Sequence, residues 1–229
     1  MRTQELSLGA VARAVRAEVF SPAGSLCSPK CEGAMRWYAW EAEIASAFFP
    51  LLRHLERTLG HAMAKQLTAR FGRMDWWDHP EIDLHHVSRS KIAAIQKKLA
   101  RDRRRMPTAG AVQRELTLGF WVSLLGPGND YETRLWRPTL RHAFPSYSGP
   151  RKPLHQDLNK LRELRNQVAH HEPIGSRPLA ADRESAYRVL GYLSTDVRDW
   201  AAVDDRIPQI LAERPTACAP ALPGTRKEL

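Results

Sequence analysis

The chain has 229 residues, of which 43% are apolar, as is typical of one globular core with short appendages. Its formal net charge of +10 favours a polyanionic partner, with nucleic acid ahead of an acidic membrane surface. No apolar run approaches the ~20 residues that a membrane helix needs, and the N-terminus lacks the compact apolar stretch of a signal peptide. We therefore expect a cytoplasmic protein with no membrane partner.

Residues 1–33 are expected to form a loose arm and linker, because a weakly amphipathic stretch leads into the Pro/Ser/Gly-rich SPAGSLCSPKCEG. Cys27 and Cys31 in this linker have the spacing of half a zinc site, but no second Cys/His pair follows at a usual spacing. With Cys218 they make an odd number, so we interpret all three as incidental thiols. No metal site and no cofactor are predicted.

Apolar residues at three- and four-residue spacing predict a helical domain over residues 34–205. A first helix starts at about Ala34, and Pro50 begins a second one, because proline suits the first turn of a helix. Gly72 ends this second helix. Its expected buried stripe consists of Leu51, Leu52, Leu55, Leu59, Met63 and Leu67.

Shorter helices follow, joined by loops such as MDWWDHPEID. One helix begins near Ser88 as its N-cap. Its inward residues are Ile92, Ile95 and Leu99. Another short helix follows Thr108, and LTLGFWVSLLG is predicted as a buried helix rather than a strand because of its leucine content and its neighbours. YETRLWRPTLRHAF is predicted to be helical, with a break at Pro138.

Two stronger helices complete the domain. One runs from about Lys152 to Glu172 and stops before Pro173, because the residue before a proline disfavours the α region. The last covers RESAYRVLGYLSTDVRDWAAV, with Tyr187, Leu190, Leu193, Val197 and Trp200 in register. No period-two alternation holds up anywhere, so the fold class is all-α. Residues 206–229 are expected to form a C-terminal tail, and its Pro/Ala-rich part RPTACAPALPGTRKEL is expected to be disordered.

The stretch LRELRNQVAHHEPIG, residues 161–175, concentrates ionisable groups at the end of a helix. Continuing its apolar stripe leads to His171 at the edge of the core, whereas His170 shares another face with Asn166, within reach of Arg165. The stripe itself consists of Leu158, Leu161, Leu164 and Val168. On the residues alone, the histidines either cap the helix or carry chemistry. No HExxH motif, serine triad or phosphate-binding glycine loop is present.

The string RNQVAH, with Arg165, Asn166 and His170, resembles the R-N-x-x-x-H signature of HEPN-domain ribonucleases. The wider pattern resembles the Abi-like (abortive infection) branch of that family over about residues 36–200. Five stretches of this chain resemble segments of the family and occur in the same order. They are WYAWEAEIASAFFPLLRHLERTLGHAMAKQL, the Trp76-Trp77 pair, ELTLGFWVSLL, LWRPTLRHAFP and LRELRNQVAHHEPI. One departure is Gly60-His61, where members often carry an Arg-Asn pair. The resemblance implies a HEPN-like helical bundle with extra helices.

The same resemblance implies a metal-independent endoribonuclease. The ribose 2′-OH attacks the adjacent phosphate, which yields a 2′,3′-cyclic phosphate and a 5′-OH. Arg165, Asn166 and His170 are the implied catalytic residues, and Glu56 in HLERTL is a supporting residue that orients Arg165 or His170. A histidine suits the proton transfer and an arginine fork suits the developing charge. For His171 both packing and catalysis stay open.

The expected partners also come from the resemblance. One helix supplies a single arginine and a single histidine on different faces, and relatives line one cleft with two such helices, so a homodimer with a shared site is implied. RNA is the expected substrate, and an RNA or protein antitoxin is an expected partner of a toxin or phage-defence effector. Two alternatives are an inactive HEPN-like scaffold that binds RNA or an antitoxin, and a helical regulatory protein whose basic surface binds an antitoxin or DNA.

Further RNA contacts are assigned to a basic cluster that ends the helix after residue 88. Its main candidates are Lys97, Lys98, Arg101 and Arg104. The alternative is a solvated helix end that complements the helix dipole. Five aromatic residues could stack on bases, although core packing is their more usual role in a bundle. They are Trp76, Trp77, Phe120, Trp121 and Trp136. His85-His86 after Asp83 is a weak hint of a metal, with a polar loop as the alternative.

Overall fold

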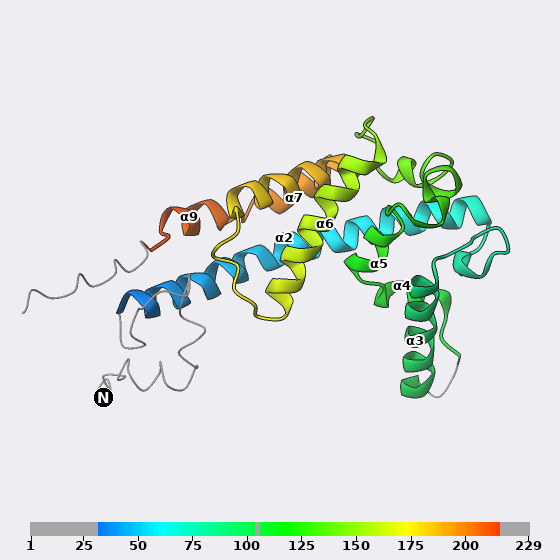
Figure 1. Ribbon diagram of the computed structural model, residues 1–229, viewed down its shortest axis with the longest axis horizontal. Helices are drawn as coiled ribbons and strands as arrows, with labels where there is room; N and C mark the ends of the chain where they lie inside the picture. Colours follow the sequence, from blue (N-terminus) through cyan, green and yellow to red (C-terminus); the bar gives the residue numbers. More distant parts are fainter. Residues whose placement is uncertain (1–31, 104–105, 216–229) are drawn as a thin grey trace, which may run out of the picture.

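The computed structural model of the protein describes residues 32–103 and 106–215. Almost all of the predicted arm and most of the tail lie outside these ranges, as do Cys27, Cys31, Arg104 and Cys218. Within the described ranges the chain forms helices and turns and no strand, which confirms the all-α prediction (Figure 1). None of these helices combines the length and the apolar character needed to cross a bilayer.

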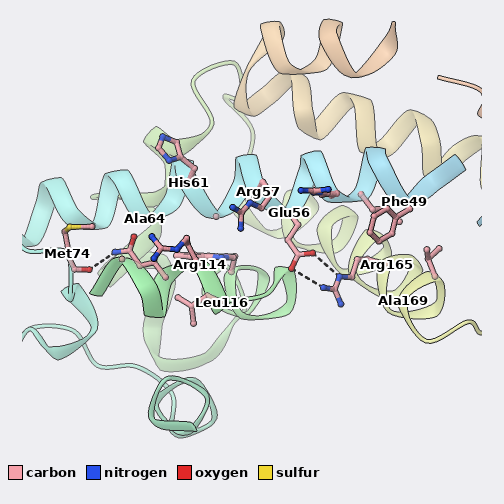
Figure 2. Close-up of a pocket in the computed structure, with 17 residues that line it drawn as sticks. Phe49, Glu56, Arg57, His61, Ala64, Met74, Arg114, Leu116, Arg165 and Ala169 are labelled. Atoms are coloured by element: carbon pink, nitrogen blue, oxygen red, sulfur yellow. Dashed lines mark hydrogen bonds and ion pairs between the residues drawn. The ribbon is translucent and has the colours of Figure 1, made fainter. Parts of the chain in front are cut away.

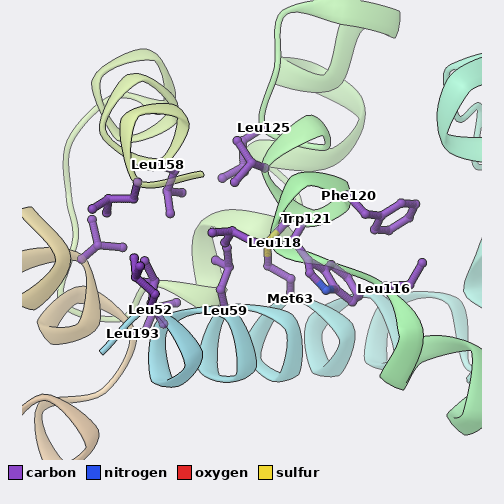
Figure 3. Close-up of a cluster of buried hydrophobic side chains, with 14 of the residues drawn as sticks. Leu52, Leu59, Met63, Leu116, Leu118, Phe120, Trp121, Leu125, Leu158 and Leu193 are labelled. Carbon is purple, nitrogen blue, oxygen red and sulfur yellow. The ribbon is translucent and has the colours of Figure 1, made fainter. Parts of the chain in front are cut away.

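Helix α2 (Glu32–Phe71) is the axis of the fold. Its 40 residues span about 60 Å at 1.5 Å per residue, and α5, α6, α7, α8 and α9 all pack against it (Figure 1). The predicted stripe from Leu51 to Leu67 is buried (Figure 3). Gly72 ends the helix as predicted, with a left-handed φ of 67° and its N–H donated to the Thr68 carbonyl at 2.9 Å.

Pro50 lies inside α2, so the predicted break at this residue is wrong. A proline within a helix removes one N–H donor, and its ring crowds the carbonyl four residues earlier. Pro50 and Ser46 are both exposed, so water can hydrate the freed Ser46 carbonyl. Phe48 and Leu51 are buried on either side of the proline and continue one stripe without a change of register. Burial along the whole helix outweighs the local cost of the ring.

Helices α6 (Arg151–Ala169) and α7 (Leu179–Leu193) pack against α2 and against each other. Leu158, Leu161 and Leu164 are fully buried, and Val168 packs on the core while partly exposed, as predicted. Each buried leucine contributes roughly 1.5–3 kcal/mol. The stripe therefore holds α6 on the bundle up to its last turn.

The predicted last helix is in fact two helices, α7 and α8 (Thr195–Ala202). Ser194 between them is extended (φ −164°, ψ 121°), and its hydroxyl accepts the Val197 N–H at 3.3 Å, so a serine N-cap starts a new helix. The break changes the direction of the chain, and Trp200 is 64% exposed. Its predicted place in the core is wrong.

A further helix, α9 (Ile207–Ala212), follows the predicted end of the domain at residue 205. Ile207 and Ile210 are buried, and the indole N–H of Trp40 in α2 donates to the Ile210 carbonyl at 2.8 Å. This contact fastens the described C-terminal segment to the first half of α2.

Helices α3 (His86–Arg103), α4 (Ala109–Glu115) and α5 (Leu118–Ser123) follow α2. α3 projects from the bundle and contacts α4 and α5 (Figure 1). It begins at His86, so Ser88 is not its N-cap as predicted but is buried in the first turn, with its hydroxyl 3.4 Å from that of Ser123. α4 follows Thr108 as predicted, with Thr108 as its N-cap, and the segment of α5 is helical as predicted.

The short turns hold aromatic residues. η2 (Trp76–Asp78) follows α2, η3 (Gly128–Asp130) precedes the π-helical turn η4 (Glu132–Trp136), and η5 (Leu140–Ala143) comes after the predicted break at Pro138. All five aromatic candidates for base stacking are at most 7% exposed, which confirms the core alternative. They are Trp76, Trp77, Phe120, Trp121 and Trp136.

The continuity of α2 through Pro50 is testable. Pro50→Ala restores the missing helical N–H and removes the ring, so it is expected to raise the free energy of unfolding by about 1–3 kcal/mol in urea titrations. Pro208→Ala is the matched control, because Pro208 sits in the first turn of α9, where proline is tolerated, and little change is expected. Equal, small effects at both positions would mean that a helix begins at Pro50.

Candidate functional site at the contact of α2 and α6

Glu56 of α2 and Arg165 of α6 form an ion pair between residues 109 positions apart (Figure 2). The carboxylate accepts from Arg165 Nε at 3.0 Å and from Nη2 at 3.3 Å, so both of its oxygens are used. The side chain of Glu56 is 18% exposed and that of Arg165 is 29% exposed. The structure thus joins two of the predicted site residues, and Arg165 is one of the two groups that Glu56 was expected to orient.

The Glu56 carboxylate has a third donor. The backbone N–H of Leu118, the first residue of α5, donates to Glu56 Oε1 at 2.7 Å. Thr117, which precedes it, makes no side-chain cap of its own, so Glu56 satisfies one of the free N–H groups at the start of α5. A negative charge is also favourable at a helix N-terminus. One carboxylate therefore connects α2, α5 and α6.

The ion pair lies in the wall of a pocket of about 700 Å³ formed by α2, α4, α5 and α6 (Figure 2). Residues of α2 at three- and four-residue spacing form one side, among them Arg53 and Arg57, and α4 contributes Arg114. Within residues 32–103 and 106–215, these three arginines make no hydrogen bond or ion pair. Because Glu56 is already paired, the pocket carries uncompensated positive charge.

Gly60 determines how closely α5 approaches the pocket side of α2. A Cβ at this position would lie 2.8 Å from Nε1 of Trp121 and 3.2 Å from Cε2. Trp121 is 2% exposed and held in the core, so it has no room to move aside. Glycine therefore lets the indole form part of the pocket wall.

Helix α6 ends in a Schellman motif, three residues before the predicted end at Glu172. The His171 N–H donates to the Val168 carbonyl at 3.4 Å, and the Glu172 N–H donates to the Gln167 carbonyl at 2.9 Å. His171 has a φ of 57°, a conformation that favours glycine. Its side chain is exposed, as is that of His170, so the prediction that His171 lies at the edge of the core is wrong. The core stripe would reach His171 only if the helix continued through it.

The segment after the histidines returns to α2. Ile174 is fully buried, and the Gly175 N–H donates to Glu41 Oε1 at 2.6 Å. A Cβ on Gly175 would lie 2.7 Å from the Trp37 ring, so only glycine allows this close approach. These contacts, rather than Pro173, hold the end of α6 against the bundle.

Asn166 and His170 do not line the pocket. Its lining reaches Val168 and Ala169, so His170 directly follows a residue of the rim. In the part of the chain that the structure describes, no hydrogen bond or ion pair engages the side chains of Asn166, His170 or His171. The structure brings Arg165 to the pocket and leaves His170 outside it.

Lys97, Lys98 and Arg101 of the predicted basic cluster lie on α3, away from the pocket lining. Lys97 is exposed, Lys98 donates to Glu115 of α4 at 2.9 Å, and Arg101 lies 3.6 Å from Asp102. The hydrogen bond with Glu115 raises the pKa of Lys98. The rings of His85 and His86 are 4.2 Å apart, and among the described residues no group of three or more His, Cys, Asp or Glu could hold a metal ion.

Sequence reasoning missed Arg53, Arg57 and Arg114 as lining residues. Arg53 and Arg57 are four residues apart and flank Glu56, so a helical wheel of this segment could have placed all three on one side of α2. No comparable signal exists for Arg114, because only the packing of α4 and α5 against α2 brings it to the pocket.

Comparison of the chain with protein-family models, with curated proteins and with solved structures found no match. The function is therefore inferred from the chemistry of the pocket and of the residues beside it.

The three-way contact of Glu56 predicts a measurable coupling. Glu56→Gln and Arg165→Met are each expected to lower the free energy of unfolding by about 1–3 kcal/mol, because each leaves half-buried partners unsatisfied. The double variant is expected to lose less free energy of unfolding than the two single variants lose together. The difference, which is the coupling energy of the double-mutant cycle, is expected to be about 1 kcal/mol or more in urea unfolding. The exposed pair Arg206–Glu43 is the matched control and is expected to show little coupling. Strict additivity at Glu56 and Arg165 would contradict the ion pair.

The Schellman motif predicts opposite effects at the two adjacent histidines. His171→Gly is expected to raise the free energy of unfolding by about 1 kcal/mol, because glycine adopts a left-handed φ without strain. His170→Gly is expected to give no such gain, since His170 has a φ of −101°. Thermal and urea unfolding of the two variants checks this pair, and stabilisation by His170→Gly alone would refute the described helix end.

Proposed function

We propose that the protein is a metal-independent endoribonuclease that cleaves RNA by transesterification. The observation that carries the proposal is the Glu56–Arg165 pair in the wall of a pocket lined by three arginines without acidic partners in the described chain. The pocket adjoins the end of α6, where Arg165, Asn166 and His170 form the R-N-x-x-x-H pattern that resembles HEPN-domain ribonucleases of the Abi-like branch.

The pocket suits a phosphodiester. Glu56 holds Arg165 through Nε and Nη2, which leaves Nη1 without a partner among the described residues. A guanidinium positioned in advance can donate to the phosphate oxygens as they gain negative charge in the transition state. Arg53, Arg57 and Arg114 add positive charge around the same volume. Uncompensated arginines destabilise the free protein by mutual repulsion, which an anionic substrate would relieve.

The reaction needs two proton transfers. As the 2′-oxygen bonds to phosphorus, its proton leaves to a base, and as the bond from phosphorus to the 5′-oxygen breaks, that oxygen receives a proton. An imidazole can accept and return a proton near neutral pH. We assign this role to His170, with Asn166 holding its tautomer or a phosphate oxygen. His171, which occupies the helix-ending position, is assigned no catalytic role.

We further propose that the active form is a homodimer in the cytoplasm. The support is that His170 lies outside the pocket lined by Arg165 within one chain, so His170 would reach such a pocket from the α6 end of a second chain. His61 of α2 also lines the pocket, but it is not part of the R-N-x-x-x-H pattern. Two-fold symmetry would then supply both pockets equally. By the resemblance, such an enzyme acts as a toxin or phage-defence effector restrained by an RNA or protein antitoxin.

A second candidate function is an inactive scaffold that binds RNA or an antitoxin. It is favoured by the same separation of His170 from the pocket. Cleavage distinguishes the two candidates, because binding by arginines needs no imidazole.

The enzyme proposal predicts RNA cleavage in EDTA, with 2′,3′-cyclic phosphate and 5′-OH ends. Arg165→Ala and His170→Ala, each shown to be folded, are expected to lower the rate by about 10²–10⁴-fold. His171→Gln is the matched control at the neighbouring imidazole and is expected to retain activity. Full cleavage by Arg165→Ala and His170→Ala would refute the assigned site. No cleavage by the wild-type protein, freed of any bound inhibitor, would favour the scaffold.

Mixing the two inactive variants tests the shared site. If each pocket combines the arginine of one chain with the histidine of its partner, a re-equilibrated equal mixture of Arg165→Ala and His170→Ala is expected to recover about a quarter of wild-type activity. Light scattering confirms that the mixture is dimeric. A dimeric mixture without recovery, or a stable monomer that cleaves RNA, would refute the shared site.

A further inference from the structure

Two large aromatic side chains are exposed beside the pocket. Phe49 of α2 is 55% exposed and Trp200 of α8 is 64% exposed. They line a second, smaller hollow, which we call the Phe49–Trp200 hollow. Its lining is completed by Pro50, Arg53, His54 and Arg57. Phe49, Arg53 and Arg57 line both depressions, so the hollow is continuous with the arginine-lined pocket.

The position of Trp200 is defined by α2 and by the break before α8. The rings of His54 and Trp200 meet edge to face, with centroids 4.6 Å apart and an interplanar angle of 63°. Burial, and then the positive charge of Arg53, lowers the pKa of His54, which favours the neutral imidazole in this contact. The Ser194 N-cap turns α8 so that the indole is presented beside Arg53 and Arg57 rather than in the core.

Aromatic side chains next to unpaired arginines match one class of ligand. Unpaired bases stack on aromatic rings regardless of sequence, while their phosphates are attracted to arginines. A second copy of the chain fits less well. A two-fold contact through this surface would set Arg53 and Arg57 close to the same residues of the other copy, and like charges repel.

We propose that the Phe49–Trp200 hollow binds single-stranded RNA at the entrance of the pocket, with bases on Phe49 and Trp200 and phosphates on Arg53 and Arg57. The inference rests on the proposed function in one respect, namely that the pocket cleaves the strand that the hollow holds. Duplex RNA is a poor ligand for the hollow, because paired bases are already stacked within the helix. The enzyme is therefore selective for unpaired segments.

The test uses fluorescently labelled oligonucleotides whose ribose units all carry 2′-O-methyl groups, because these cannot undergo transesterification. Fluorescence anisotropy measures binding of the full-length protein to three probes: the single strand, the same strand annealed to its complement, and a strand of equal length without bases. Wild type is expected to bind the single strand best.

Phe49→Leu and Trp200→Leu each keep an apolar side chain and remove a stacking surface. Each is expected to weaken binding of the single strand by about 5- to 150-fold and to leave binding of the abasic strand unchanged. Trp200→Phe, which retains an aromatic ring, is expected to keep most of the affinity. Thermal unfolding of each variant checks that the fold is intact.

Arg53→Gln and Arg57→Gln are expected to act through charge. Log affinity falls as log salt rises, and each substitution should reduce the steepness of this fall by about 0.7. The same reduction is expected for the abasic and the base-containing strand. Lys65→Gln is the matched control, because Lys65 is exposed on the same helix and lines neither the hollow nor the pocket. Its slope is expected to stay near that of wild type.

Three results would overturn the inference. One is unchanged binding by both leucine variants, and another is equal affinity of wild type for the duplex and the single strand. The third is that Trp200→Leu shifts the monomer–dimer equilibrium, measured by sedimentation velocity, without changing RNA binding. The hollow would then be a contact between subunits. Because the probes cannot be cleaved, base-dependent binding supports the hollow even if the ribonuclease proposal fails. Cleavage without base-dependent binding would reject the hollow alone.

Discussion

The arrangement of the helices around the pocket depends on one carboxylate. Glu56 accepts the Leu118 N–H and two N–H groups of Arg165, and so joins α2 to the start of α5 and to the last turns of α6. A half-buried charge is costly unless its hydrogen-bonding capacity is used, and here three donors use it. The direction of Arg165 therefore follows from the packing of three helices rather than from its own helix alone.

The positive charge of the chain is distributed unevenly within the described residues. Many arginines outside the pocket are paired, as in Arg177–Asp182 and Arg183–Asp205, where both carboxylates are nearly buried. Such pairs contribute to the fold by joining segments that are distant in sequence or by bracing turns. Arg53, Arg57 and Arg114 of the pocket have no such partners among the described residues. Charge that does not stabilise the fold is the charge available for an anionic ligand.

The end of α6 combines strain with firm attachment. His171 adopts a left-handed φ that glycine would adopt more easily, while Ile174 and Gly175 anchor the following segment on α2. The anchors compensate the strained residue, and both histidines are exposed just beyond the pocket lining. The two adjacent histidines therefore differ. His171 forms the turn that ends α6, whereas the side chain of His170 makes no hydrogen bond or ion pair among the described residues.

The sequence alone determined the helical class and most of the buried stripes, because apolar spacing reports directly which side of a helix is covered. It also predicted the helix end at Gly72 and the helix start after Thr108, where a single residue type has a local effect. The uninterrupted passage of α2 through Pro50, the break at Ser194 and the exposure of Trp200 depended on tertiary structure. At these positions, burial against neighbouring helices competes with local preference, and the sequence does not state which is stronger. The same holds for the site: spacing drew attention to Arg165 and His170, but only packing could bring Glu56 and Arg114 to one pocket and leave His170 outside it.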